Sequence, residues 1–206
     1  MTMNLPACNC PPLTGDEEIK INGESLFVRD FWSYCYSDLL WPTIRGDFAE
    51  FIVMRALMSK EQRTANYPTR KIGDVVDFWV NENQKIEIKS SSYLQSWEKP
   101  EQVLPKFDIA KRQGWNNEKE KAIKNKKRWS DFYVFCLFAH KDRETAKPLD
   151  TNQWKFYMAE TSAINKNFGD KKKISLLDLE NKLNLKPIIY SKLASNFSRL
   201  AAAKKS

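Results

Sequence analysis

The sequence predicts an α/β protein in which a mixed central β-sheet is flanked by helices. Three observations favour this fold class: a helical pattern, two short strand patterns that follow it, and two longer apolar runs. They lie at Asp47 to Ser59, at Val75 to Val80 and Lys85 to Ser92, and at Phe132 to Ala139 and Trp154 to Glu160. Helix, hairpin and further strands in this order are typical of a sheet covered by helices.

The first half of the chain contains two expected helices and a hairpin. Aromatic residues are dense from Arg29 to Leu40, and Trp41-Pro42 ends that helical pattern. Gly46 then precedes Asp47, which suits the N-cap or the first turn of the next helix. The polar segment Asn81 to Gln84 separates the two short strand patterns, so these predict a β-hairpin.

The second half predicts strands and a late helix. Phe107 to Ala110 suits a short strand, Ser175 to Leu183 has helical spacing, and Pro187 to Leu193 suits a short element. We therefore expect a flexible N-terminal arm at 1–15, a single domain at 16–200 and a C-terminal tail at 201–206.

Composition limits the function classes. The 206 residues suffice for one sizeable core, and 42% hydrophobic residues argue for a folded domain. The net charge of +8 favours a polyanionic partner, with nucleic acid as the first class to consider. No window reaches the ~18 apolar residues of a membrane span, so we expect no membrane partner and a soluble, cytoplasmic protein.

Two absences narrow the chemistry further. His140 is the only histidine, which excludes paired-histidine nucleases and histidine-rich zinc sites within one chain. The six glycines are scattered and match neither a P-loop nor a dinucleotide-binding turn.

The predicted hairpin sorts its residues onto two faces, because side chains alternate along a strand. The apolar face, expected in the core, comprises Val76, Phe78, Val80, Ile86 and Ile88. The opposite face comprises Asp77, Trp79, Lys85, Glu87 and Lys89.

The register of this hairpin follows from its apolar face. If both apolar sets face one core, Asp77 must lie opposite Glu87, because a slip of one residue would reverse a whole strand. This register implies a three-residue turn at Asn81 to Asn83, with Asn83 in the left-handed region.

Two facing carboxylates repel, and a divalent cation removes the repulsion. Mg²⁺ usually takes one or two carboxylates together with waters and a substrate phosphate. Lys89 shares the face of Glu87 and would lie near the scissile phosphate. The alternative is a solvated strand face on which Lys89 pairs with Glu87 or Asp77.

Glu50 supports the metal interpretation. It has no basic residue three or four positions away on its own helix, and it lies on a stripe with Val53, Met54 and Leu57. A carboxylate among apolar residues must be paired, protonated or bound to metal. The alternative is an ion pair with an arginine from elsewhere, such as Arg45 or Arg70.

This order of residues resembles the active-site pattern of the PD-(D/E)xK nuclease superfamily, the restriction-endonuclease-like fold. The pattern is a helix glutamate (Glu50), a strand aspartate (Asp77) and the run Glu87-Ile88-Lys89. The likeness extends over Arg45 to Trp97 and is similar to a little-characterised group of small bacterial members.

The resemblance implies roles for individual residues. Asp77, Glu87 and the Ile88 carbonyl would hold Mg²⁺ or Mn²⁺, with Glu50 binding directly or through water. Lys89 would orient or activate the attacking water, and Gln95 would assist.

The sequence departs from the family pattern at one position. Val76 stands where the family motif has proline, which leaves Asp74 as a competing aspartate. The pairing of the strands prefers Asp77, because Asp74 falls near the start of the strand and on the other parity.

A basic stretch follows the site in the sequence, and two tryptophans flank most of it. We expect it to bind nucleic acid through phosphate contacts and base stacking. Its candidate residues are Lys111, Arg112, Trp115, Lys119, Lys121, Lys124, Lys126, Lys127 and Arg128. The alternative is a solvated helix anchored to the core by Trp115 and Trp129.

The expected function is a metal-dependent nuclease, with DNA favoured over RNA as substrate and an endonucleolytic mode favoured. Two alternatives stay open: a binding module of the same fold without catalysis, and a nuclease that cleaves RNA. Duplex cutters of this fold often act as dimers, so a homodimer is compatible with the resemblance.

Overall fold

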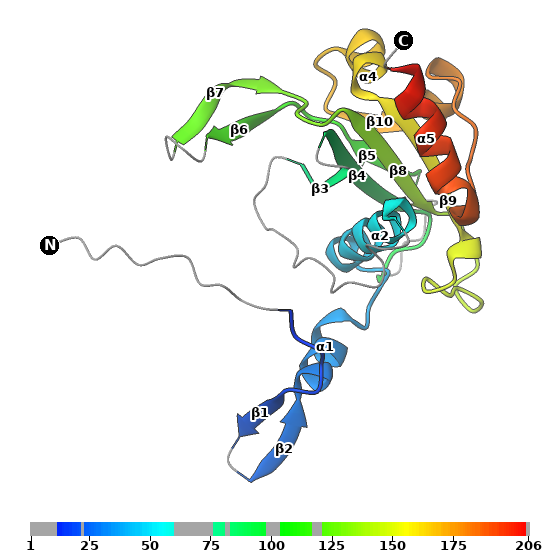
Figure 1. The fold of residues 1–206 in the computed structure, drawn as a ribbon. Helices are drawn as coiled ribbons and strands as arrows, with labels where there is room; N and C mark the ends of the chain where they lie inside the picture. Colours follow the sequence, from blue (N-terminus) through cyan, green and yellow to red (C-terminus); the bar gives the residue numbers. More distant parts are fainter. Residues whose placement is uncertain are drawn as a thin grey trace, which may run out of the picture.

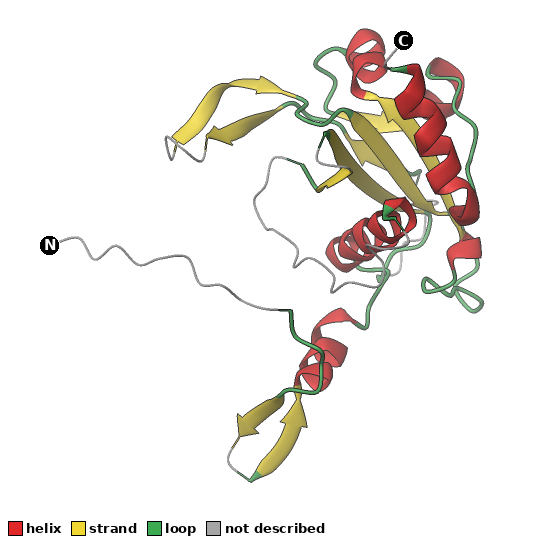
Figure 2. Ribbon diagram, in the orientation of Figure 1, coloured by secondary structure: helices red, strands yellow, loops and turns green. Residues whose placement is uncertain are grey.

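A four-stranded mixed sheet forms the centre of the molecule, with helices on its faces (Figure 1; Figure 2). The computed structural model describes residues 12–21, 23–59, 76–80, 83–97, 104–116 and 121–204, with backbone only at 115–116 and 121–122. The strands of this sheet, in spatial order, are β3 (Phe78–Val80), β4 (Gln84–Ser92), β8 (Phe132–Phe138) and β9 (Trp154–Glu160). β4 and β8 are parallel, whereas the two outer pairs are antiparallel, so the predicted mixed sheet with flanking helices is confirmed.

Strand β8 is buried along its whole length, because both faces of the sheet are covered. Val134 and Cys136 belong to the core on one face, and Phe135 and Leu137 to the core on the other. This arrangement explains why the run from Phe132 shows no polar alternation.

One face is covered by two helices, α2 (Pro42–Leu57) and α5 (Leu193–Ala203). The other face is covered by β5 (Lys106–Asp108), α4 (Thr161–Phe168), β10 (Lys173–Ser175) and a π-helical turn η2 (Asp178–Lys182). None of the helices within the described ranges has the length and apolar character that crossing a bilayer requires.

Helix α2 begins earlier than the sequence suggested. Pro42 occupies its first turn, where a missing N–H costs nothing, and Trp41 is the N-cap. Asp47 therefore lies inside the helix, and the expectation that it opens the helix was wrong. Trp41-Pro42 starts α2 rather than merely ending α1 (Val28–Tyr36).

Two smaller units extend from the body of the molecule (Figure 1). The first combines α1 with the hairpin β1 (Glu18–Ile21) and β2 (Glu24–Phe27), and the second is the hairpin β6 (Arg112–Asn116) and β7 (Lys121–Lys127). The first unit includes Thr14 and Gly15, whose backbone N–H groups donate to the Glu17 carboxylate, so the end of the expected arm is structured.

The C-terminal region also differs from expectation. Only part of the expected helix at Ser175 to Leu183 forms, because Ser175 ends β10 and η2 follows. Short 3₁₀ turns lie at Thr151–Gln153 and Tyr190–Lys192. Ala201 is buried in the last turn of α5, so the expected tail from 201 onward begins later.

Candidate functional site

The β3–β4 hairpin has the register that the apolar alternation required. Phe78 pairs with Ile86, and Val80 pairs with Gln84 across a three-residue turn. Val76, Val80, Ile86 and Ile88 are buried, which confirms the predicted core face. Among the described non-glycine residues only Asn184 has a positive φ. The expectation that Asn83 adopts the left-handed conformation was therefore wrong.

Asp77 lies just before the first paired residue of β3 and contacts β4 twice. Its backbone N–H donates to the Ile86 carbonyl at 3.0 Å, and its carboxylate accepts from the Ile88 N–H at 2.5 Å. The N–H and C=O of one strand residue point toward the same edge, so the Ile88 carbonyl faces the Asp77 side of β4. The Asp77 carboxylate and the Ile88 carbonyl therefore lie at the same edge of β4. The competing Asp74 lies outside the described residues.

Glu87 and Lys89 form an ion pair on the opposite face of β4 from the buried isoleucines. The Lys89 Nζ lies 2.5 Å from Glu87 Oε1, and both side chains are mostly buried. This is the pairing that the sequence left open as an alternative to a metal. It satisfies both charges in the metal-free chain and holds the lysine over the strand beside Asp77.

The pKa of Asp77 shows that three other expected site residues act on this carboxyl group. Burial, followed by the negative charge of Glu87, raises this pKa to about 7. The Ile88 N–H and Lys89 oppose the rise, and Glu50 adds to it. Asp77 and Glu50 also raise the pKa of the Cys136 thiol, after the larger effect of its burial. The structure therefore places Glu50, Glu87 and Lys89 within electrostatic reach of Asp77.

The donor set fits a hard divalent cation. Asp77 and Glu87 offer carboxylate oxygens and Ile88 offers a carbonyl, which are the ligand types that Mg²⁺ and Mn²⁺ take. Within the described ranges, no cluster of three or more His, Cys, Asp or Glu side chains is arranged to hold a metal ion. Mg²⁺ needs only one or two carboxylates when waters and a phosphate complete its shell, so this smaller set suffices.

Arg45 is a buried arginine that joins α2 to β4. Its guanidinium donates to the Leu40 carbonyl at 2.8 Å, to Ser90 Oγ at 3.2 Å and to Gln95 Oε1 at 3.4 Å. The sequence suggested Arg45 as one of two possible ion-pair partners of Glu50. These hydrogen bonds show that its guanidinium connects α2 to β4 and to the segment that follows β4. The second suggested partner, Arg70, lies outside the described residues.

Gln95 belongs to the same network on the α2 side of β4. Besides accepting from Arg45, it donates to the Ser92 carbonyl at 3.2 Å. These contacts fix the segment that follows β4 against α2. An assisting role of Gln95 in catalysis stays a prediction.

The basic stretch is a β-hairpin, not a helix, and much of it is exposed. We call β6–β7 the basic hairpin; its exposed cationic side chains are Arg112, Lys124, Lys126 and Lys127. At its base, Lys111 pairs with Asp170 at 2.7 Å and Arg112 with Asp108 at 2.9 Å. Lys119 lies outside the described residues, as do the side chains of Trp115 and Lys121.

Arg128 does not lie with the exposed basic residues, although it was expected to bind nucleic acid. It is 6% exposed, and its guanidinium donates inward to four acceptors. They are the carbonyls of Ile109 (2.7 Å), Gly169 (2.9 Å) and Lys171 (3.1 Å) and the Asn165 Oδ1 (2.7 Å). The residue ties the base of the basic hairpin to the body.

Trp129 has an anchoring role, as in the alternative in which Trp115 and Trp129 anchor the basic stretch. Its indole N–H donates to the Arg112 carbonyl at 2.8 Å, and its ring covers Gly114 so closely that an added Cβ would lie 2.4 Å from it. The ammonium of Lys127 lies 4.2 Å from the centre of that ring. Trp129 therefore packs across the base of the basic hairpin.

Two neighbours of the site have roles that the sequence did not indicate: Tyr133, and Arg45 beyond its possible pairing with Glu50. Tyr133 is the β8 partner of Glu87, and burial together with the Glu87 charge raises its pKa above the ordinary tyrosine value. A parallel pairing between distant strands leaves no local signal in a sequence, so Tyr133 could not be placed. The sequence shows Arg45 five residues before Glu50, but it does not show that Arg45 is buried.

Comparison with known proteins adds no relative to this geometry: no family model matches the chain, and no curated protein is similar to it.

The pKa of Asp77 predicts how pH affects the stability of the metal-free chain. Because the folded pKa of about 7 lies above the ordinary value of 3.8, the folded state holds a proton that the unfolded state has lost between these values. The free energy of unfolding should fall as pH rises from about 4 to about 7 and change little above that.

Urea unfolding in EDTA across this range measures the effect. Asp77→Asn should remove this part of the pH dependence, since asparagine does not titrate. An identical slope in the variant would contradict the assignment of the shift to Asp77.

Proposed function

We propose that this protein is a metal-dependent nuclease that hydrolyses phosphodiester bonds, with DNA as the favoured substrate and internal cleavage as the favoured mode. The observation on which the proposal rests is the Asp77 carboxylate hydrogen-bonded to the Ile88 N–H beside the Glu87–Lys89 ion pair. The two mostly buried carboxylates, Asp77 and Glu87, repel each other and so destabilise the metal-free chain. Together with Lys89 they therefore suit phosphate chemistry better than a structural role.

The side chains have separable roles in this proposal. Asp77 and Glu87, with the Ile88 carbonyl, would hold Mg²⁺ or Mn²⁺, and Glu50 would add negative charge from α2. When bound, the cation would supply positive charge to the scissile phosphate and to the attacking water. Lys89 would donate hydrogen bonds to a phosphate oxygen or to that water, since its ammonium has three protons and Glu87 accepts one.

The position of the basic hairpin supports a polyanionic substrate. β7 ends at Lys127 and β8 begins at Phe132, so the hairpin leads directly into the strand that pairs with β4. Tyr133, the second residue of β8, is the partner of Glu87. A backbone held by the exposed lysines is thus directed toward the end of the sheet where Glu87 lies.

A cleavage assay with the purified full chain tests the proposal. Supercoiled plasmid, linear duplex, single-stranded DNA and RNA would each be incubated with Mg²⁺, with Mn²⁺ and with EDTA. The proposal expects DNA to be cut with either cation and to survive in EDTA. Binding without metal-dependent cleavage would favour the non-catalytic module, and cleavage confined to RNA would favour the ribonuclease.

Replacing the exposed lysines of the basic hairpin should weaken nucleic-acid binding without affecting the fold. In the triple variant Lys124→Gln, Lys126→Gln and Lys127→Gln, the slope of log affinity against log salt should become shallower by about 2 to 3, because each lost phosphate contact releases about one counterion fewer. Fluorescence anisotropy over a salt series measures this slope.

A matched control removes three exposed lysines elsewhere, with Lys155→Gln, Lys166→Gln and Lys186→Gln. Both triple variants lose the same net charge, so only a local contact distinguishes them. Equal losses in the two would assign the effect to net charge and not to the basic hairpin.

A further inference from the structure

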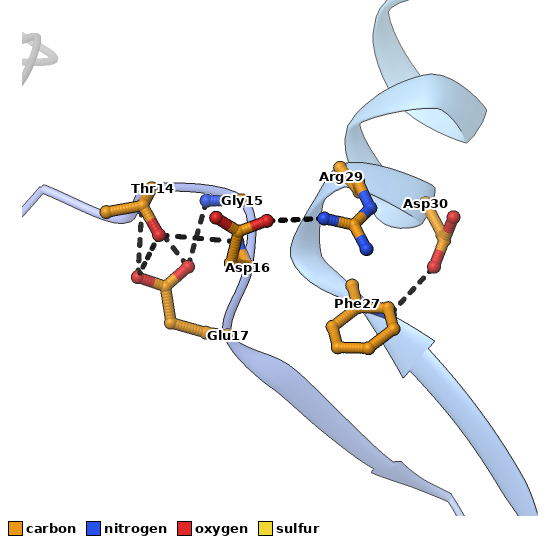
Figure 3. Close-up of polar contacts among 7 residues, drawn as sticks. All are labelled: Thr14, Gly15, Asp16, Glu17, Phe27, Arg29 and Asp30. Atoms are coloured by element: carbon orange, nitrogen blue, oxygen red, sulfur yellow. Dashed lines mark hydrogen bonds and ion pairs between the residues drawn. The ribbon is translucent and has the colours of Figure 1, made fainter.

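The N-terminal unit, residues 12–21 and 23–41, is held together by local contacts (Figure 3). Asp16 forms an ion pair with Arg29, and the Asp30 carboxylate accepts from the Phe27 N–H at 2.7 Å. The backbone of Val28 donates to the Glu17 carbonyl at 3.0 Å. These contacts define how β1, β2 and α1 fold onto one another.

This unit has almost no interior of its own. None of the residues of α1 is buried, and Gly15, which the Trp32 ring covers, is the buried residue of the unit. About thirty residues cannot bury enough surface to be stable alone. A second surface that covers the unit would therefore stabilise it.

The uncovered surface is aromatic. Tyr34 is 88% exposed, Phe31 51% and Tyr36 49%. The Trp41 ring instead packs edge-on against Trp97 of the body, with their centres 5.6 Å apart. Aromatic residues gathered on an exposed surface are typical of protein interfaces. The unit extends away from the rest of the molecule in Figure 1.

The charge of the unit indicates what covers it. It contains the basic residues Lys20 and Arg29 against six acidic ones, Asp16, Glu17, Glu18, Glu24, Asp30 and Asp38. The whole chain has 34 basic and 26 acidic residues, so the remainder is strongly positive. An acidic surface repels nucleic acid and a second acidic unit, and it attracts a basic protein surface.

We propose that the N-terminal unit docks on the basic hairpin of a second copy of this chain, and that the second copy returns the same contact. The hairpin presents Arg112, Lys124, Lys126 and Lys127 as exposed cations. It also extends from the body, so a partner can reach it (Figure 1). Two equivalent contacts of this kind close a symmetric dimer.

The inference does not depend on the proposed function, because self-association is measured without nucleic acid. If the basic hairpin also binds nucleic acid, the two partners compete for it.

Sedimentation equilibrium of the full chain tests the proposal. The chain should be a dimer whose dissociation constant rises about tenfold or more between about 0.1 M and about 1 M NaCl. Tyr34→Ser with Phe31→Ser should weaken the dimer about tenfold or more, and the high exposure of both rings means that the fold should survive, as circular dichroism would verify.

A charge exchange makes the test specific. Glu18→Lys with Glu24→Lys on one chain, and Lys124→Glu with Lys126→Glu on another, should each weaken self-association, and mixing the two chains should restore a heterodimer. The control Lys155→Glu with Lys166→Glu reverses two charges on the body and should leave the dimer intact.

The proposal would be overturned if the chain stayed monomeric, or if the charge exchange left the dimer unchanged. It would also be overturned by a monomer whose N-terminal unit binds only another basic protein.

Discussion

Asp77→Asn is expected to lower the rate of metal-dependent cleavage about 1,000-fold or more and, at the same time, to stabilise the metal-free protein at pH 8. The rate falls because the neutral amide binds a hard cation poorly. The stability rises because the variant removes a buried charge that repels Glu87, while the oxygen of the new side-chain amide can still accept from the Ile88 N–H. Roughly 2 kcal/mol follows from 1.36 kcal/mol per pKa unit after allowance for partial exposure.

Glu87→Gln should show the same loss of cleavage. Initial rates on plasmid with Mg²⁺, together with urea unfolding in EDTA, measure both effects. Glu144→Gln, an exposed carboxylate in the connection between β8 and β9, is the control and should change neither. Full activity of Asp77→Asn would remove the basis of the proposed site, and lost activity with lost stability would indicate a structural role.

Arg128→Met is expected to destabilise the protein by about 3 kcal/mol or more. The variant removes four hydrogen bonds from a charged donor, worth about 1 kcal/mol each, and leaves the buried Ile109 carbonyl without a partner. Because these acceptors belong to the segment after β5 and to the end of α4, the base of the basic hairpin should loosen first.

Thermal unfolding and urea titration measure this loss. Arg112→Met, an exposed arginine at the same base, is the control and should cost less than about 0.5 kcal/mol. If Arg128→Met instead kept its stability and lost nucleic-acid affinity, the original assignment of Arg128 to the binding surface would be right.

The sequence was sufficient for the β3–β4 hairpin because its information is local. Alternating apolar residues at Val76, Phe78 and Val80 and at Ile86 and Ile88 exclude a register shifted by one residue, and the structure has the register expected with the shortest turn. The expectation that Asp77, Glu87 and Lys89 share one face followed from the same alternation. Glu50 was added from its apolar stripe on the helix and from the resemblance.

The basic hairpin could not be recognised in the same way. β7 consists of Lys121-Ala122-Ile123-Lys124-Asn125-Lys126-Lys127, which has no regular alternation of apolar residues. Arg128 adjoins this run and looks the same in the sequence. Its burial depends on Ile109, Asn165 and Gly169, which only the tertiary fold brings together.

Other differences had local signals that were overlooked. Asn22-Gly23 lies between two short patterns with β-propensity, and such a pair is a strong hairpin signal. Gly23 has a φ of +84°, as the turn between Ile21 and Glu24 requires. Leu193, Phe197 and Ala201 are spaced four apart and form the buried stripe of α5.

The basic hairpin is part of the connection that joins β4 to β8, and this position has an evolutionary consequence. A connection between parallel strands can grow at little cost, since doubling the length of a flexible loop costs only about 0.6 kcal/mol. The hairpin could therefore lengthen, shorten or change its residues while the paired strands keep Glu87 beside Tyr133. A chain built in this way can acquire a new target without rebuilding the strands that hold its carboxylates.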